Sequence, residues 1–400
     1  MAQIKYWVWL SSQTNTSSRS RAALIEHYGD AETAFFAPEG EFKSVPGVSA
    51  LDAAILEKRD LSRTDEILGL CGERDISLLA MNDAQYPLRL RHTFAPPTVL
   101  YVKGRLPNVD ELPAVAVIGT RGASPYGLKM GRSLAYEIVK CGGVIVSGLT
   151  QGVDEAAARG ALLAGGVCIG VLGTAFGESE SALQRDVAQL GALVSEYPPG
   201  TRSLKSFFRE RNRISAGLSA GVAVVEAPEV SGALLFAQEA QEQGREIFAV
   251  PGNADSPNSA GAIELIKQGA KAVTCGWDVM EELQAMFPGK ISAAPPSVCP
   301  DEPAVRARPE KIKKPDAPQK VIDKEKDSGY IDLTKQLSQL SDEQLKIIAA
   351  IDRDGSGIDD IIENSALSTA KVLSQLTVLE IKGYIRRVSG RRIVLNTAKK

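Results

Sequence analysis

Arginines, small residues and aromatic rings recur in this sequence at places where a phosphate could bind. Gly119, Thr120 and Arg121 follow the apolar run at residues 115–118 and precede a helical pattern that begins at Tyr126. In an open α/β sheet such a loop lies at the carboxyl end of its strand, where backbone N–H groups and a helix N-terminus favour a phosphate. The guanidinium of Arg121 would add a bidentate donor. Alternatively, Gly119 serves only a tight turn and Arg121 pairs with a surface carboxylate.

A second cluster of cations and aromatic rings lies at residues 207–219, FFRERNRISAGLS. Arginines bind phosphates through paired hydrogen bonds and an aromatic ring stacks on an unpaired base, so this combination suits single-stranded nucleic acid. We expect Arg211 and Arg213 to hold phosphates of the strand and Phe208 to support a base. We also expect one phenylalanine of this pair, but not both, to lie in the core. The alternative is that the arginines pair with nearby glutamates and both rings fill the core.

Small and polar residues also follow other strand-like runs of the sequence. They are Ser147, Gly148, Gln151 and Gly152 after residues 144–146, and Ser231 and Gly232 after residues 221–225. Helical stretches separate these runs, so we expect parallel strands whose tails line one edge of a sheet and form one crevice. Asp154, beside the second loop, is expected to cap a helix or to pair with an arginine.

Acid–base, nucleophilic and metal chemistry find little support in this sequence. The two histidines, His27 and His92, fall outside the strand-end loops, so the crevice lacks a histidine for catalysis or for metal binding. No P-loop sequence is present, and the five cysteines lack the C-x-x-C spacing of a zinc site. We therefore predict a binding protein with no catalytic residue, metal or cofactor.

Charge and cysteine content restrict the class of protein further. The formal net charge of -3 excludes a globally basic nucleic-acid binder but leaves room for a local basic patch. Scattered cysteines without a pairing pattern indicate a reducing compartment. The apolar stretch at residues 6–10 is too short for a signal or membrane segment, and no later stretch is long enough to span a bilayer. We expect a cytoplasmic protein without membrane contact.

Four regions of different composition follow one another. Residues 1–66 predict a helical domain, in which the turn at 45–49 is either a plain connection or a helix-hairpin-helix element. Residues 67–289 carry the α/β pattern, and residues 290–335 hold seven prolines, which indicate an extended linker. Residues 336–400 have the helices and hairpin of a winged helix, whose paired arginines either contact DNA or are solvated. The expected fold class is α/β, an extended Rossmann-like parallel sheet with an N-terminal helical domain and a C-terminal winged helix.

Six sequence blocks in the α/β region resemble those of a known family. The blocks are VIGTRGASPYG, SGLTQGVDEAAARGAL, SEYPPG, FFRERNRISAGLS, VVEAPEVSGALLFAQEA and REIFAVPGNADSPNSAGAIELIKQGA. In this order, over residues 86–288, they look like the signature blocks of the DprA/Smf family, the DNA-processing proteins of natural transformation. The resemblance implies a Rossmann-like domain that binds and protects single-stranded DNA and passes it to the RecA recombinase, as a homodimer.

The resemblance also implies which residues bind DNA. The residues of this chain that match the family's motifs are Gly119 and Arg121 in the first loop, Gly148, Gly152 and Asp154 in the second, Arg211, Asn212 and Arg213 in an Arg-Asn-Arg block, and Ser231 and Gly232 at a helix start. The sequence departs from the family at Gln151, where a basic residue is usual, at Ala158, where a histidine is usual, and at residues 261–263. The cations that could replace the missing charge are Lys129, Lys205 and Arg202.

Two other functions compete with single-stranded DNA binding. A nucleotide-hydrolysing Rossmann enzyme similar to the lysine-decarboxylase-like phosphoribohydrolases would use Glu196 or Glu226, the glutamates within reach of the arginine cluster. Its Pro-Gly-Gly-x-Gly-Thr-x-x-Glu block is absent. A scaffold or regulator would act mainly through the winged helix and the N-terminal domain. In the leading hypothesis, arginines and glycine-loop amides hold the phosphates and affinity falls steeply with salt.

Overall fold

The chain divides into two compact units, Met1–Arg306 and Ala307–Lys400. The computed structural model describes residues 3–177, 180–293, 299–300 and, in the second unit, 342–351, 356–365 and shorter pieces up to residue 395. Most of the predicted linker, residues 294–298 and 301–335, lies outside the described residues. Among the helices that are described, none has the length and apolar character needed to cross a membrane.

A nine-stranded sheet forms the centre of the first unit, in the order β1-β2-β6-β5-β4-β3-β7-β8-β9. The strands are β1 Ser77–Ala80, β2 Val99–Gly104, β3 Ala114–Ile118, β4 Val144–Ser147, β5 Cys168–Leu172, β6 Ala192–Ser195, β7 Gly221–Val224, β8 Glu246–Ala249 and β9 Lys271–Ala272. Strands β3 to β9 pair in parallel, as the alternation of strands and helices predicts, whereas β1 and β2 add an antiparallel edge.

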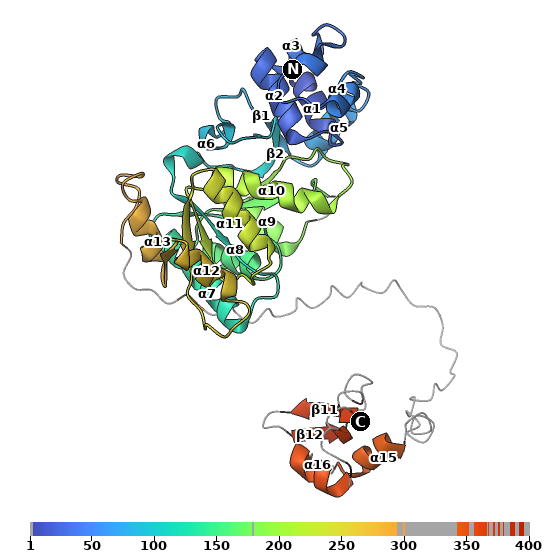
Figure 1. The fold of residues 1–400 in the computed structure, drawn as a ribbon, viewed down its shortest axis with the longest axis vertical. Helices are drawn as coiled ribbons and strands as arrows, with labels where there is room; N and C mark the ends of the chain where they lie inside the picture. The colour runs from blue at the N-terminus through green and yellow to red at the C-terminus, as the bar shows by residue number, and fades with distance from the viewer. Residues whose placement is uncertain are drawn as a thin grey trace, which may run out of the picture. The chain divides into compact units, whose positions relative to one another are not determined.

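Helices cover both faces of this sheet (Figure 1). They are α6 Leu88–Arg91, α7 Pro125–Lys140, α8 Val153–Leu163, α9 Ala182–Leu190, α10 Lys205–Leu218, α11 Gly232–Glu242, α12 Ala260–Lys267 and α13 Gly276–Leu283. Successive residues of β3 point to opposite faces, so Val115 and Val117 join one core with α7, α8 and α13. Ala116 and Ile118 join the other core with α10, α11 and α12. Burial on both faces accounts for the continuous apolar run in β3.

The chain path reverses between β3 and β7, which lie side by side in the sheet. From β3 the chain proceeds to β4 on one side, whereas from β7 it proceeds to β8 on the other. The loops that follow β3 and β7 therefore diverge to opposite faces. In open α/β sheets a crevice forms at such a switch point, outside the carboxyl ends of the strands.

Short helices make up the N-terminal part of the chain, next to β1 and β2 (Figure 1). They are α1 Ile4–Ser12, α2 Ser18–Tyr28, α3 Ala31–Phe35, η1 Glu41–Ser44, α4 Ala50–Leu56 and α5 Thr64–Glu73. The predicted boundary at residue 66 falls inside α5, and the N-terminal helices share one contiguous apolar core with one face of the sheet. Ser11 Oγ lies 2.7 Å from Tyr101 Oη of β2, which adds a buried hydrogen bond between the two parts.

The second unit contains α15 Asp342–Ala349, α16 Ile358–Ser365 and a sheet of β10 Ser356–Gly357, β11 Ile385–Val388 and β12 Arg392–Leu395. The strand order is β10-β12-β11, with both pairs antiparallel. Apolar residues from both helices and from β11 and β12 form a small core of their own. The predicted hairpin is thus present, whereas its Arg391 and the terminal Lys399 and Lys400 lie outside the described residues.

Candidate nucleic-acid-binding site

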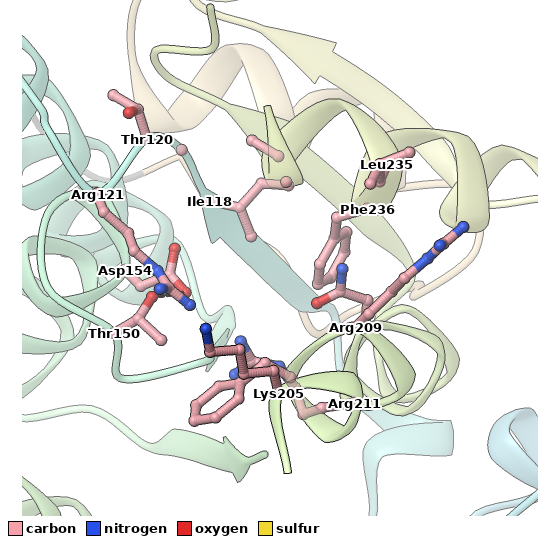
Figure 2. Close-up of a pocket in the computed structure, with 15 residues that line it drawn as sticks. Ile118, Thr120, Arg121, Thr150, Asp154, Lys205, Arg209, Arg211, Leu235 and Phe236 are labelled. Carbon is pink, nitrogen blue, oxygen red and sulfur yellow. Dashed lines mark hydrogen bonds between the residues drawn. The ribbon is translucent and has the colours of Figure 1, made fainter. Parts of the chain in front are cut away.

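A cavity of about 470 Å³ opens at the switch point of the sheet, and we call it the switch-point cavity. Its lining residues come from the ends of β3 and β4, from α10 and from the start of α11. They are Ile118, Gly119, Thr120, Arg121, Thr150, Asp154, Lys205, Phe208, Arg209, Arg211, Asn212, Gly232, Ala233, Leu235 and Phe236. Figure 2 shows Arg121 extending toward Asp154 and Thr150, while Lys205, Arg209 and Arg211 reach in from α10. The predicted crevice therefore exists, and four of its lining residues are cations.

Close packing of two glycine loops shapes one wall of this cavity. Gly152 has a φ of 97°, a left-handed backbone that favours glycine. A side chain there would also collide with the carbonyl oxygen of Thr120. A Cβ on Gly119 would lie 2.5 Å from Cγ2 of Val153. These glycines let the β3–α7 and β4–α8 loops touch, so the N–H groups after both strands lie beside one another.

Arg211 is buried beneath the cavity floor, with 6% of its surface exposed. Its Nη1 donates a hydrogen bond of 2.7 Å to the carbonyl of Val171 in β5. Burial lowers the pKa of Arg211, whereas the nearby Asp154 carboxylate opposes that shift. Arg211 is therefore a compensated, buried cation that presents only part of its guanidinium to the cavity.

Asp154 is the only carboxylate among the lining residues, and 7% of its surface is exposed. It accepts a hydrogen bond of 3.0 Å from Oγ1 of Thr150 and further bonds from the backbone N–H groups of Gly119 and Gly148. Burial raises the pKa of Asp154, against the opposing influence of Arg211. Asp154 thus connects the two loops and acts on Arg211 through its charge.

One face of α10 carries the residues that are open to the cavity. Lys205, Phe208, Arg209 and Asn212 line it, and their spacing of three, four and seven residues places them on one stripe of the helix. Lys205 and Arg209 are exposed and Phe208 is half-buried. Phe207 instead is 3% exposed and stacks on Tyr197 with ring centroids 3.8 Å apart. The prediction that one phenylalanine lies in the core and the other does not is confirmed.

Arg121 lies over the Phe208 ring, with its guanidinium carbon 5.8 Å from the ring centroid. Its side chain is exposed on the rim of the cavity. The arrangement brings a cation and an aromatic face together from two elements far apart in sequence. A guanidinium in this position can contact a phosphate while the neighbouring ring remains available to a base.

Arg213 does not line the cavity. Its Nη2 donates a bond of 2.5 Å to Glu196, and Arg21 of α2 donates one of 3.1 Å to the other oxygen of the same carboxylate. Burial raises the pKa of Glu196, but the two arginines overcome it and hold that pKa below its usual range. Arg213 therefore forms the ion pair with a glutamate that the sequence offers as an alternative to DNA binding. Through Glu196 and Arg21 it connects α10 to the N-terminal helices.

Several other predicted residues support the cavity from outside its lining. Ser147 Oγ donates a bond of 2.8 Å to the carbonyl of Asp154, and Ser231 caps α11 by accepting from Leu234 N–H at 3.4 Å. Gly148 lies directly against the Arg211 guanidinium. Gln151 is exposed in a neighbouring groove, which it shares with Gly152. The structure thus brings together Gly119, Thr120, Arg121, Phe208, Arg211, Asn212 and Gly232 in the lining, but not Ser147, Gly148, Gln151, Gly152, Arg213 or Ser231.

The departures from the family pattern have clear positions. Ala158 is fully buried in the core between α8 and the sheet. Among the three cations considered as replacements for a charge at Gln151, Lys205 lines the switch-point cavity and Lys129 lines the groove that contains Gln151. Arg202 lines neither.

The two glutamates of the hydrolase hypothesis, Glu196 and Glu226, lie outside the cavity. Glu196 is held by arginines, and Glu226 accepts bonds of 2.9 Å and 2.6 Å from the backbone N–H and the hydroxyl of Ser124. Neither glutamate lines the switch-point cavity. Among the described residues, no cluster of three or more His, Cys, Asp or Glu side chains could hold a metal ion.

Comparison with known proteins identifies the family. The family model described as DNA recombination-mediator protein A matches residues 77–284, which is more than half of the chain. The chain belongs to the DprA/Smf family. A second family model, the DprA winged helix domain, matches residues 332–391 and so confirms the predicted C-terminal fold.

Relatives in the DprA/Smf family match large parts of the chain. The DNA processing protein DprA of Bacillus subtilis is 39% identical over 221 residues, which are 54% of this chain and 74% of that protein. Protein Smf of Escherichia coli is 33% identical over 326 residues, 80% of this chain and 78% of that protein. The X-ray structure of DNA processing protein A from Streptococcus pneumoniae has a TM-score of 0.61 and 31% identity, and covers 70% of this chain and 97% of that one. Family membership places this chain among DNA-processing proteins with a Rossmann-like fold.

Proposed function

We propose that this chain binds single-stranded DNA in the switch-point cavity. The observation that carries the proposal is the stripe of Lys205, Phe208, Arg209 and Asn212 on α10, facing Arg121 across the cavity. Exposed cations for phosphates beside an aromatic face for bases are the recurring elements of sites that hold unpaired strands.

The charges of the lining favour a polyanion although the whole chain is slightly acidic. Arg211 is compensated by Asp154, which leaves Arg121, Lys205 and Arg209 available for phosphates. On a single strand, each phosphate contact contributes about 0.7 to the slope of log affinity against log salt concentration. Three contacts predict a slope of about -2 from this cavity alone.

Base identity should matter little to this site. Phe208 offers a ring that stacks on any base, and stacking contributes about 1–3 kcal/mol per base without reading its edge. A paired base keeps its faces covered by its neighbours in the duplex, so the ring selects for unpaired strands. The proposal therefore combines weak sequence preference with a preference for single strands.

We further propose that binding, rather than catalysis, is the role of the site. Asp154 is surrounded by Arg211, Thr150 and two backbone N–H groups, an arrangement that stabilises structure and leaves no free general base in the lining. The two glutamates of the rival hydrolase hypothesis are occupied elsewhere. The cavity is suited to holding a strand intact.

The family model for recombination-mediator proteins supports a larger role, in which the chain protects incoming DNA during natural transformation and loads RecA onto it. We propose that it does so in the cytoplasm as a homodimer. All five cysteines lie within the described residues and none forms a disulfide, which agrees with a reducing compartment.

Fluorescence anisotropy with labelled oligo-dT tests strand binding. Wild type should bind with a negative salt slope, and Arg121→Ala should weaken binding and reduce the slope by about 0.7. Arg105→Ala is the matched control, because Arg105 is exposed and does not line the cavity. Equal affinities and slopes for Arg121→Ala and wild type would refute the site.

RecA loading is tested separately from strand binding. Wild type should speed RecA filament formation on a strand coated with single-strand-binding protein, and Arg121→Ala should not. Sedimentation of the same samples measures the homodimer. Tight strand binding without faster filament formation would limit the function to binding and protection.

A further inference from the structure

A second groove lies beside the switch-point cavity, between the first turns of α7 and α8. It has a volume of about 560 Å³, and we call it the α7–α8 groove. Its lining residues are Arg121, Ala123, Pro125, Leu128, Lys129, Arg132, Gln151, Gly152, Glu155, Ala156 and Arg159. Four cations and one carboxylate therefore face a space similar in size to the proposed DNA site.

The single carboxylate of this groove is neutralised within its own helix. Arg159 donates bonds of 2.8 Å and 3.2 Å to Oε1 of Glu155, one turn earlier in α8. Arg121 and Lys129 add positive charge that this carboxylate does not neutralise. Lys129 is exposed, and within the described part of the chain it has neither an ion pair nor a side-chain hydrogen bond. The groove is thus positive, and Lys129 is available to an anion.

Arg121 lines both the groove and the switch-point cavity. Beside Arg121 the β3–α7 and β4–α8 loops touch, and Gly152 allows the close approach to Thr120. A strand whose phosphate contacts Arg121 can therefore extend toward either space. Leu128 of the groove, which is 42% exposed, adds apolar surface for a sugar or base.

We propose that the same DNA strand continues over Arg121 into the α7–α8 groove, where Lys129 holds a further phosphate. This inference rests on the proposed function, since it extends the path of the strand that the switch-point cavity binds. Continuity through a shared arginine favours a nucleic acid strand over an acidic peptide, because phosphates repeat along it at a regular spacing that can satisfy both clusters.

Binding in the groove can be distinguished from binding in the cavity by using oligo-dT strands of two lengths. A strand of about 5 nucleotides fills one space, whereas one of about 20 nucleotides can occupy both. In the full chain, Lys129→Ala should weaken binding of the longer strand several-fold and reduce the salt slope of that binding by about 0.7. Binding of the shorter strand should not change. Lys140→Ala is the matched control, because Lys140 lies at the other end of α7, outside the groove.

Gln151→Lys provides the complementary gain of charge. Gln151 is exposed in the groove, so a lysine there should tighten binding of the longer strand and steepen its slope by about 0.7. The double variant Lys129→Ala, Gln151→Lys should return to the slope of wild type. Such rescue would not occur if Lys129 served only the stability of α7.

Arg209→Ala distinguishes failure of this inference from failure of the proposed function. Suppose that Arg209→Ala weakens binding of both strands, whereas Lys129→Ala and Gln151→Lys bind them like wild type. The strand then does not enter the groove, and the inference is wrong. If Arg209→Ala also has no effect, the proposed function itself fails and the inference with it. Displacement of the longer strand by oligoglutamate from wild type, but not from Lys129→Ala, would assign the groove to an acidic peptide instead.

Discussion

The guanidinium of Arg211 lies so close to the backbone of Gly148 that a side chain at position 148 would collide with its Nη1 atom. The same guanidinium is fixed by the Val171 carbonyl and by the charge of Asp154. The glycine after β4 and the arginine of α10 are thus parts of one structural unit. Gly148 therefore contributes to the site indirectly: it makes room for Arg211, and only Arg211 lines the cavity.

Gly148→Ala should displace Arg211 from the Val171 carbonyl. Overpacking of a buried contact costs about 1–3 kcal/mol, and oligo-dT binding should weaken as the cavity floor shifts. Thermal unfolding and anisotropy measure the two effects. Gly122→Ala is the control, because a Cβ there has no atom within 4 Å. Equal melting temperatures for the two variants would contradict the packing argument.

Phe208→Ala should weaken oligo-dT binding without changing its salt slope. The ring contributes stacking, about 1–3 kcal/mol for one base, and no charge. Arg121→Ala, in contrast, should weaken binding and also reduce the slope. A double-mutant cycle at several salt concentrations measures both contributions and the coupling between the two side chains. A reduced slope in Phe208→Ala would show that the ring acts mainly by positioning Arg121.

Arg213→Ala should reduce stability and leave the salt slope of DNA binding unchanged. Removing Arg213 from this buried cluster costs up to about 3 kcal/mol, because the Glu196 carboxylate then keeps only Arg21 as a charged partner. Urea unfolding measures the loss, and anisotropy at a temperature where the variant is folded measures the slope. A slope reduced by about 0.7, with stability intact, would place Arg213 on the DNA after all.

Glu196→Gln should remove an acid-sensitive part of the stability. The folded-state pKa of Glu196 is lowered from the ordinary value of 4.5, so its contribution is present above about pH 4.5 and is lost as the pH falls through the lower folded pKa. The difference in unfolding free energy between wild type and variant should be largest near pH 7 and shrink below pH 4.5. Glu229→Gln, at an exposed position, is the control. A difference that is constant with pH would exclude this role.

Much of the sheet and part of the site could be predicted because they depend on local patterns. The apolar run of β3, followed by Gly119 and Arg121, predicts a buried parallel strand that ends in a binding loop. The block around Arg211 predicts cations at the same edge. Lys205 is predicted only as a replacement for the charge missing at Gln151, and Arg209 is not predicted, although their helical spacing from Phe208 and Asn212 indicates both.

The sequence alone leaves the role of Arg213 open between DNA binding and an ion pair with a glutamate. Its partner Glu196 is 17 positions away and is shared with Arg21, which is 175 positions from that glutamate. Only the docking of α2 against the sheet brings the three charges together. Gln151, which we predict in the crevice, lines the α7–α8 groove instead of the switch-point cavity.

Photo-crosslinking tests most directly the claim that the switch-point cavity holds the strand. An oligo-dT carrying iodouracil is irradiated with the full chain, and the modified peptides are mapped by mass spectrometry. The structure predicts an adduct on the peptide of α10 that contains Phe208, and its loss in Phe208→Ala. Adducts confined to residues 336–400, with the α10 peptide unmodified, would contradict the account and assign DNA binding to the winged helix.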